Sequence, residues 1–325
     1  MGCNQTRSTS QPAEPVAQVE TEQERADEAP HPHTQEENSD GHAENQAAAQ
    51  PLTQTEVDLP HIHGMGFSAD GRQLFVAAHD GLRVFSEGQW LIPNLPAHDY
   101  MGYAATADGF YSSGHPHPSS GLVNPLGLVK SEDGGQTLTT LGFEGESDFH
   151  LMAAGYHNQA VYVLNPAPNS KLSVGLHYSL DEGQTWQQSA LQGLTANPIQ
   201  IVVHPTEANR VALATEGGLF LSDDYGNTFE QVGEGEVVTA VSFTPEGSHL
   251  LFGTQALFDY DLAEDQETSI ESPPLSADDA IAYIAVNPAQ TNEIALATFA
   301  RHIYLTLNRG QSWIQIAQEG KAVSD

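Results

Sequence analysis

The chain has 325 residues, 39% of them hydrophobic, so it is long enough to bury a substantial core. Its 43 acidic and 10 basic side chains give a formal net charge of −33, which argues against nucleic acid as a partner because phosphate contacts need Lys and Arg. The single cysteine, Cys3, excludes an internal disulfide, and no apolar run reaches the length of a transmembrane helix.

Residues 1–57 are predicted to form a disordered, acidic tether. They are rich in Glu, Gln, Ala and Pro and nearly lack large apolar side chains, so burial cannot offset the entropy of ordering them. Gly2-Cys3 is typical of the start of a bacterial lipoprotein with Cys3 as the lipidated residue, although residues 1–6 also fit a myristoylation signal. Three histidines give the tether a weak cation-binding composition: His31, His33 and His42.

Residues 58–325 are predicted to form an all-β domain, because short apolar runs alternate with Gly and turn dipeptides and no helical period appears. The runs fall into six groups, whose first strands are predicted at 61–68, 100–106, 149–155, 199–204, 237–243 and 281–287. Four strands per group, repeated six times, indicate a six-bladed β-propeller, or a seven-bladed one if the tail holds a further strand.

A turn motif, S/T-x-D/N-x-G-x-T/S-aromatic, occurs four times, with Leu138 in place of the aromatic residue in the first copy. The Asp or Asn caps backbone amides, the Gly accepts a positive φ, and the aromatic residue returns the chain to the core. We therefore predict that the motif is structural and joins the third strand of a blade to the fourth. Its residues are Asp133, Gly135, Asp181, Gly183, Trp186, Asp224, Gly226, Phe229, Asn308, Gly310 and Trp313.

The motif also assigns the two faces of the predicted propeller. If its turns mark the bottom face, then the connections between blades and those between second and third strands lie on the top face. Seven of the twelve histidines in residues 58–325 fall on this top face, all in the first three blades: His61, His63, His79, His98, His115, His117 and His150. Every methionine except the initiator lies close to one of them: Met65, Met101 and Met152.

This cluster predicts a transition-metal site, since imidazole is the commonest protein metal ligand and a site needs three or four converging donors. The best inner-strand candidates are His61, His63, His98 and His150, and the loop containing His115 and His117 would cover the site. Imidazole with thioether selects copper, whereas imidazole with a carboxylate, from Asp99 or Asp148, suits zinc. A methionine on an inner strand also serves as core filler, and a lone histidine as a hydrogen-bonded loop residue, so both interpretations stay open.

The turn motifs resemble those of the BNR or Asp-box propellers, a superfamily that includes sialidases, sortilin-type receptors and photosystem assembly factors. Four segments together, His61–Phe67, Ser112–Pro116, Asn124–Ser131 and Glu146–His150, are similar to a family of bacterial, often lipid-anchored Asp-box propellers labelled glycosyl-hydrolase-like. The resemblance covers about residues 59–320. It implies an extracytoplasmic lipoprotein, at the cell surface or in the periplasm, and supplies no catalytic residues.

Three functions are compatible with these residues. The leading hypothesis is a non-enzymatic, membrane-tethered binding protein with copper or zinc, or a small ligand held through the metal, on its top face. The alternative is a glycoside hydrolase that acts on a neutral glycan through Asp99 and Asp148. Sialidase activity is disfavoured because only Arg301 is predicted on the top face, where sialidases gather three arginines. The third hypothesis is a receptor-like or assembly scaffold with a protein partner.

Overall fold

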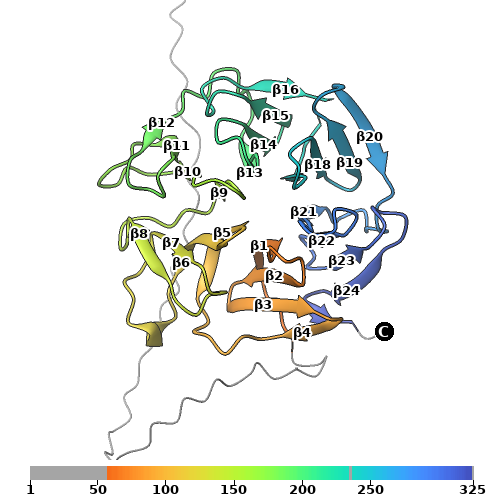
Figure 1. Cartoon of the computed structure of the whole chain (residues 1–325), viewed down its shortest axis with the longest axis horizontal. Helices are drawn as coiled ribbons and strands as arrows, with labels where there is room; N and C mark the ends of the chain where they lie inside the picture. The colour runs from red at the N-terminus through yellow and green to blue at the C-terminus, as the bar shows by residue number, and fades with distance from the viewer. Residues whose placement is uncertain (1–56, 234–235, 324–325) are drawn as a thin grey trace, which may run out of the picture. The chain divides into compact units, whose positions relative to one another are not determined.

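The computed structural model describes residues 57–233 and 236–323. Six antiparallel sheets stand in a ring around a central axis (Figure 1). Blade 1 contains β1 (Ile62–Phe67), β2 (Gln73–Ala78), β3 (Gly81–Ser86) and β4 (Gln89–Leu91). Blade 2 contains β5 (Asp99–Thr106), β6 (Gly109–His115), β7 (Leu128–Ser131) and β8 (Thr139–Gly142). Blade 3 contains β9 (Met152–Ala154), β10 (Val161–Asn165), β11 (Gly175–Ser179) and β12 (Gln187–Gln188).

The remaining three sheets follow the same order from the centre outward. Blade 4 contains β13 (Pro198–Val203), β14 (Val211–Thr215), β15 (Gly218–Ser222) and β16 (Glu230–Val232). Blade 5 contains β17 (Ala240–Phe243), β18 (His249–Gly253), β19 (Leu257–Asp261) and β20 (Gln266–Ile270). Blade 6 contains β21 (Ile281–Val286), β22 (Ile294–Thr298), β23 (Ile303–Thr306), β24 (Ile314–Gln318) and β25 (Lys321–Ala322). One short 3-10 turn, Pro118–Ser120, lies between β6 and β7.

Each innermost strand packs beside the next, and β21 packs beside β1, so the ring is closed. This confirms the predicted six-bladed propeller. Within the described residues, the tail adds a fifth strand, β25, to blade 6 and no seventh blade. The predicted tether, with Cys3, lies outside the described residues except for Val57. The described residues contain no helix that is long and apolar enough to cross a membrane.

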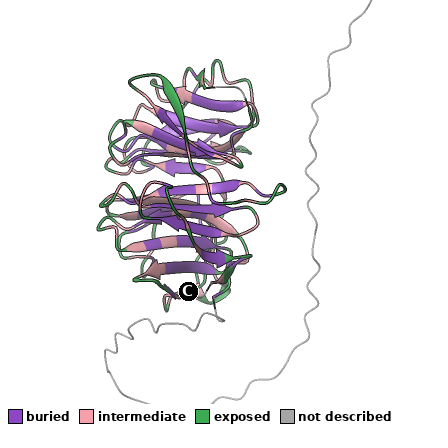
Figure 2. Ribbon diagram, turned by 90° about the vertical axis from the view of Figure 1, so that its right-hand side faces the viewer, coloured by how far each residue is buried: buried purple, intermediate pink, exposed green. Residues whose placement is uncertain are grey.

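Apolar side chains between neighbouring blades form the core. Figure 2 shows that buried residues run through the strands, whereas the connections at both faces are exposed or half-buried. The seam between blades 6 and 1 is closed by the first described residues: Leu59 is fully buried, and its N–H donates to the Gly320 carbonyl at 2.9 Å. The Trp90 indole N–H donates to the Ile316 carbonyl across the same seam. The first and last blades are thereby held together without a covalent link.

The four turn motifs share one geometry, at the connections between third and fourth strands. In the copy that follows β11, Asp181 Oδ1 accepts the Thr185 N–H at 2.8 Å and Asp181 Oδ2 accepts the Thr185 hydroxyl at 2.7 Å. The Ser179 hydroxyl donates to the same carboxylate and accepts the Gly183 N–H. Both carboxylate oxygens are satisfied within the turn itself. Each carboxylate oxygen therefore has a hydrogen-bond partner inside the turn, which agrees with a structural role.

Candidate metal centre

Three side chains from the first two blades meet on the top face. His63 belongs to β1, His79 lies in the connection between β2 and β3, and Asp99 begins β5. One ligand atom from each lies within 4.8 Å of the others. His79 Nδ1 is 2.8 Å from Asp99 Oδ2, and His63 Nε2 is 3.5 Å from Asp99 Oδ1. We call these three residues the first cluster.

The strand pairing explains why these residues converge. Ile62 pairs with Ala78 and Gly64 with Ala77, so His63 is the extra residue of a bulge, a feature that re-aims a side chain. The close approach of β1 to β5 depends on Gly66, because a Cβ there would lie only 2.4 Å from the Ala105 Cβ. The glycines of the His61–Phe67 segment thus let His63 reach Asp99 on the next blade.

Two polar atoms of the first cluster, one from His63 and one from Asp99, are buried without a hydrogen-bond partner. The Asp99 and His63 side chains are only 11% and 17% exposed, whereas His79 is 60% exposed. His63 Nε2 and Asp99 Oδ1 are both buried and have no hydrogen-bond partner. Buried polar atoms are normally paired, because an unpaired one costs the free energy of its desolvation. A cation between these two atoms would satisfy both.

The electrostatics of His63 favour the form of imidazole that binds metals. Burial lowers the pKa of His63, the Asp99 carboxylate opposes that shift, and the neighbouring His79 and His61 reinforce it. His63 is therefore neutral near pH 7 and keeps a lone pair for a metal. His61 is exposed, and its ring lies 6.3 Å from that of His63 and 6.1 Å from that of His79.

A second group forms around Asp148, which precedes β9. His150 Nε2 lies 2.7 Å and His115 Nε2 3.2 Å from Asp148 Oδ2. The hydrogen bond to Asp148 raises the pKa of His150 against the effect of burial. The other nitrogen of His115, Nδ1, lies 2.7 Å from Asn124 Oδ1. We call His115, Asp148 and His150 the second cluster.

Two of the predicted histidines serve the covering loop instead of the centre. His98 is buried, its Nδ1 accepts the His117 backbone N–H at 3.0 Å, and its ring packs edge-on against Tyr100. Successive residues of an extended chain point to opposite sides, so His98 faces away when Asp99 faces the centre. His117 Nδ1 pairs with the Ser119 hydroxyl. His98 therefore lies apart from the first cluster, and His117 positions the loop.

The methionines differ in their surroundings. Met152 is 6% exposed and belongs to an apolar cluster with Phe149, whereas Met65 and Met101 are half-buried. Met65 and Met152 line the same central cavity as His63. The donors that the structure gathers most closely are imidazoles and carboxylates, the pattern that suits zinc.

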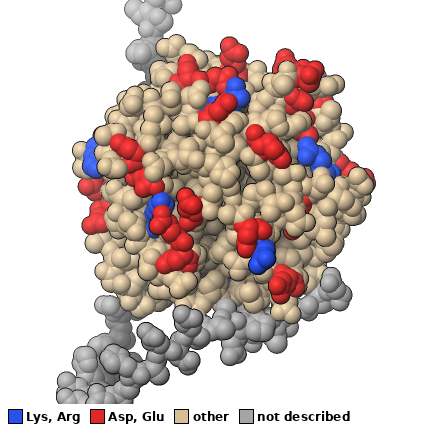
Figure 3. Space-filling view, in the orientation of Figure 1, with Lys and Arg blue, Asp and Glu red and all other residues tan. Residues whose placement is uncertain are grey.

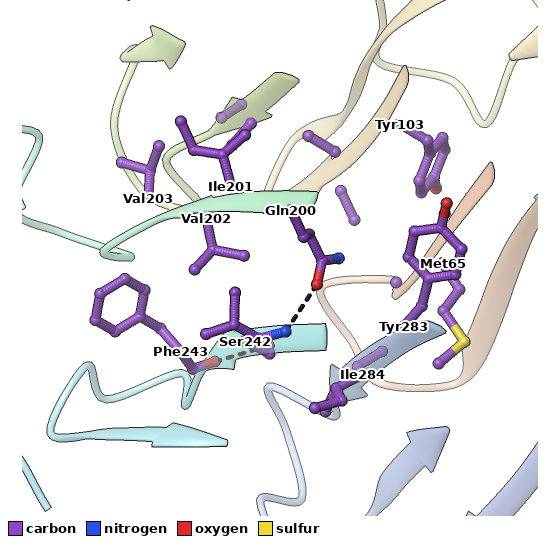
Figure 4. Close-up of a pocket in the computed structure, with 18 of the residues that line it drawn as sticks. Met65, Tyr103, Gln200, Ile201, Val202, Val203, Ser242, Phe243, Tyr283 and Ile284 are labelled. Atoms are coloured by element: carbon purple, nitrogen blue, oxygen red, sulfur yellow. Dashed lines mark hydrogen bonds between the residues drawn. The ribbon is translucent and has the colours of Figure 1, made fainter. Parts of the chain in front are cut away.

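The cavity lies along the propeller axis and has a volume of ≈ 260 Å³. Its wall is formed by the innermost strands, and His63 and His150 both line it. Figure 4 shows Tyr103 and Tyr283 with their hydroxyl ends pointing toward one another, near Gln200. Gln200 Oε1 accepts the Val241 N–H at 2.7 Å, and burial raises the pKa of Tyr283 to about 12. No sequence pattern distinguished these lining residues from ordinary core residues.

The arginines of residues 57–233 and 236–323 do not form an anion site of the sialidase type. Arg83 is buried against the Asp58 carbonyl and the Asp80 carboxylate, and Arg301 donates to the Pro60 carbonyl. The other described arginines pair with carboxylates: Arg72, Arg210 and Arg309. Figure 3 shows acidic side chains over the outer part of one face, several beside basic ones, around a hollowed and mostly uncharged middle.

The fold and the two clusters define a six-bladed propeller with a His/Asp centre on its top face. No protein-family model matches the chain, and no curated protein matches its sequence. Solved structures do match. A GH74 enzyme from Niastella koreensis superposes with a TM-score of 0.56 at 18% identity, over 80% of this chain and 46% of that one. A GH74 xyloglucanase from Xanthomonas campestris gives 0.50 at 18% identity, over 83% of this chain and 47% of that one.

A third match is the extracellular domain of a hybrid two-component system from B. thetaiotaomicron, with a TM-score of 0.52 at 13% identity, over 85% of this chain and 35% of that one. The chain spans about half the length of the two GH74 structures. At these identities the similarity shows the fold alone. Because the same propeller occurs in enzymes and in a two-component system, the function has to be argued from the site.

Proposed function

We propose that this protein is an extracytoplasmic, membrane-tethered propeller that binds a divalent transition metal, zinc in the first place, through His63, His79 and Asp99. The observation that carries the proposal is the pair of buried, unpartnered atoms, His63 Nε2 and Asp99 Oδ1, beside a third donor. Membrane tethering rests on the resemblance of about residues 59–320 to a family of often lipid-anchored Asp-box propellers, with Cys3 as the residue that would carry the lipid.

One pair of donors in the first cluster, His63 and Asp99, has the spacing of two ligands on a small tetrahedral ion, whereas His79 Nδ1 and Asp99 Oδ2, 2.8 Å apart, are at hydrogen-bond distance and would move apart to bind it. Two ligand atoms about 2.1 Å from a tetrahedral zinc ion are roughly 3.4 Å apart. His63 Nε2 and Asp99 Oδ1 are 3.5 Å apart. Two imidazoles and one carboxylate also leave a fourth coordination position open, the arrangement of zinc sites that bind a further ligand. The exposed side of His79 leaves that position accessible from solvent.

Zinc titration calorimetry tests the proposal. The tether carries donors of its own, so the reference chain is the full-length protein with Cys3→Ser, His31→Gln, His33→Gln and His42→Gln. His79→Gln removes one donor of the first cluster, and because His79 is exposed the variant should fold. We expect zinc affinity at that site to fall at least tenfold. His157→Gln, which removes an exposed histidine from the bottom face, is the matched control and should leave the affinity unchanged.

Equal zinc affinity in the reference chain and the His79→Gln variant would contradict the proposal. Copper is the competing ion, and we expect it to use a methionine thioether as a ligand. A copper affinity that exceeds the zinc affinity and falls on Met65→Leu substitution would assign the site to copper.

A glycoside hydrolase is the second candidate, favoured by one specific observation. Asp99 and Asp148 both lie on the top face, and each keeps one buried, unpartnered oxygen. Two such carboxylates are the minimum for hydrolysis of a glycosidic bond. A screen of neutral glycans with the Asp148→Asn variant as control tests this candidate. If the reference chain hydrolyses a glycan and Asp148→Asn abolishes that activity, the protein is a glycoside hydrolase and the binding function is rejected. If neither the reference chain nor the variant hydrolyses any glycan, metal binding is the better supported function.

A further inference from the structure

We propose that the top face holds a second divalent cation, bound by His115, Asp148 and His150 beside the first. This inference rests on the proposed function, since it extends one metal site to a pair. Its donors are of the same kinds as those of the first cluster, two imidazoles and one carboxylate from neighbouring blades, although they do not all lie within the 4.8 Å of one another that the donors of the first cluster do. His115 ends β6 and Asp148 and His150 precede β9, so blades 2 and 3 build the second cluster as blades 1 and 2 build the first.

The hydrogen bonding of His115 leaves one of its ring nitrogens facing a carboxylate oxygen without a hydrogen between them. Asn124 Oδ1 is an acceptor, so His115 Nδ1, 2.7 Å away, carries the hydrogen and donates it. In the neutral ring Nε2 then presents a lone pair, yet it lies 3.2 Å from Asp148 Oδ2, another acceptor. Two acceptors that face each other need a proton or a cation between them. A metal-ligating imidazole usually donates its far N–H to an oxygen acceptor that orients the ring, and Asn124 Oδ1 is placed as such an acceptor.

The carboxylate of Asp148 gives the second argument. Its Oδ2 contacts both histidines, while its Oδ1 is buried and has no partner. In the bottom-face turn after β11, by contrast, both carboxylate oxygens of Asp181 accept hydrogen bonds from Thr185 of the same turn. The segment around Asp148 is held in place, because the Phe149 N–H donates to the Ser113 hydroxyl at 2.9 Å. The unpartnered oxygen is therefore presented from a fixed backbone, as a preorganised ligand requires.

The two clusters are structurally joined. Asp99 of the first cluster and His115 of the second are direct partners in the pairing of β5 with β6, a relation that places their Cβ atoms about 5 Å apart. His63 and His150 line the same cavity. One strand pair therefore supplies a ligand to each site, and the two ions would occupy one continuous centre at the mouth of the cavity.

Native mass spectrometry tests this inference by counting the zinc ions bound per chain. The protein is the reference chain defined above, with Cys3 and the three tether histidines replaced, and it is dialysed against a zinc-containing buffer before the measurement. We expect two ions in the reference chain, one in His79→Gln, one in His150→Gln and none in the double variant. His150 is 61% exposed, so its replacement should not disturb folding. His157→Gln is the control and should keep two. Asn124→Ala should weaken the second ion by about tenfold and leave the first unchanged, because it removes only the orienting amide.

The outcomes separate this inference from the proposed function. One zinc ion in the reference chain that His150→Gln does not remove overturns the second site and leaves the first intact. No zinc at all overturns both. Two or more ions whose number none of the substitutions changes would assign the binding to the acidic surface and overturn the paired centre.

Discussion

The two faces of the propeller use the same side chain in opposite ways. On the bottom face, Asp133, Asp181 and Asp224 each bond to a backbone N–H and a hydroxyl within their own turn. On the top face, Asp99 contacts His63 and His79 of the neighbouring blade, Asp148 contacts His115 of the neighbouring blade and His150 of its own connection, and each carboxylate keeps one buried oxygen without a hydrogen-bond partner. The location of a carboxylate's partners therefore separates a structural aspartate from a candidate ligand.

Histidines show the same contrast. On the bottom face, His204 is buried with both ring nitrogens satisfied, since Nε2 pairs with the Gly247 carbonyl at 3.0 Å and Nδ1 accepts the Glu207 N–H at 3.0 Å. On the top face, His63 Nε2 is buried without a hydrogen bond. A satisfied nitrogen has nothing to gain from a metal ion, whereas an unsatisfied one does.

The largest expected effect that follows from this contrast is stabilisation by zinc. An ion that binds only the folded state at 100 times its Kd adds about 2.7 kcal/mol to the free energy of unfolding, so two ions add about 5 kcal/mol. For a domain of this size, that raises the Tm by roughly 10 °C. Thermal unfolding of the reference chain with and without zinc measures the rise. The double variant His79→Gln/His150→Gln should show none of it.

A smaller effect is expected at Gly102, which lets β5 lie against the segment that carries the second cluster. A Cβ at this position would lie 2.2 Å from the Phe149 carbonyl oxygen and 2.6 Å from Met152 Cγ. Gly102→Ala should lower the free energy of unfolding by about 1–3 kcal/mol, the usual cost of overpacking, and should also weaken zinc binding. Gly88→Asn is the control, since nothing lies within 4 Å of a Cβ there. Unchanged stability and zinc affinity in Gly102→Ala would refute the proposed close approach.

The bottom-face turns should affect stability without affecting the metal. Asp224 Oδ1 accepts the Thr228 N–H at 2.8 Å, and this cap is lost in Asp224→Ala. We expect the free energy of unfolding to fall by about 1 kcal/mol, as for other capping residues. Denaturant unfolding measures this change, and calorimetry should show the zinc affinity unaltered. A loss of zinc binding would mean that the two faces are not independent.

The smallest effect concerns the pH dependence of the metal-free protein. Burial lowers the folded-state pKa of His204 below its ordinary value of 6.5. Its stabilising contribution is therefore complete above pH 6.5 and is lost as the pH falls toward the folded pKa, because the unfolded chain takes up the proton first. Denaturant unfolding at pH 7.5 and pH 5.5 should show a decrease in the free energy of unfolding that is smaller in His204→Gln, because His63, His98 and His177, whose pKa values burial also lowers, remain. An equal decrease in both chains would assign it to other groups.

The fold followed from the sequence because the repeated turn motif and the alternation of apolar runs are local signals. The turns at Asp133, Asp181 and Asp224 identified the bottom face of the propeller. The strand order then assigned seven histidines to the opposite, top face. The separation of His98 from Asp99 was not predictable, since it depends on which side of one strand faces the axis. The bulge that re-aims His63 arises from strand pairing, which a single sequence does not specify.

The second cluster shows another limit of sequence reasoning. The predicted first strand of blade 3, residues 149–155, is shorter in the structure, because β9 begins only at Met152. Asp148 and His150 consequently lie in a connection, where they reach His115 of the neighbouring blade. The role of Asn124 depends on a contact across the loop between β6 and β7, and no spacing rule indicates it.

Anomalous X-ray diffraction at the zinc edge, from crystals of the reference chain grown with zinc, tests the central claim most directly. Zinc ligand distances are about 2.0–2.2 Å for nitrogen and oxygen donors. We expect a peak at that distance from His63 Nε2, His79 Nδ1 and an oxygen of Asp99, and a second peak between His115, Asp148 and His150. Peaks only at exposed carboxylates, or at the turns around Asp133, Asp181 and Asp224, would contradict the account.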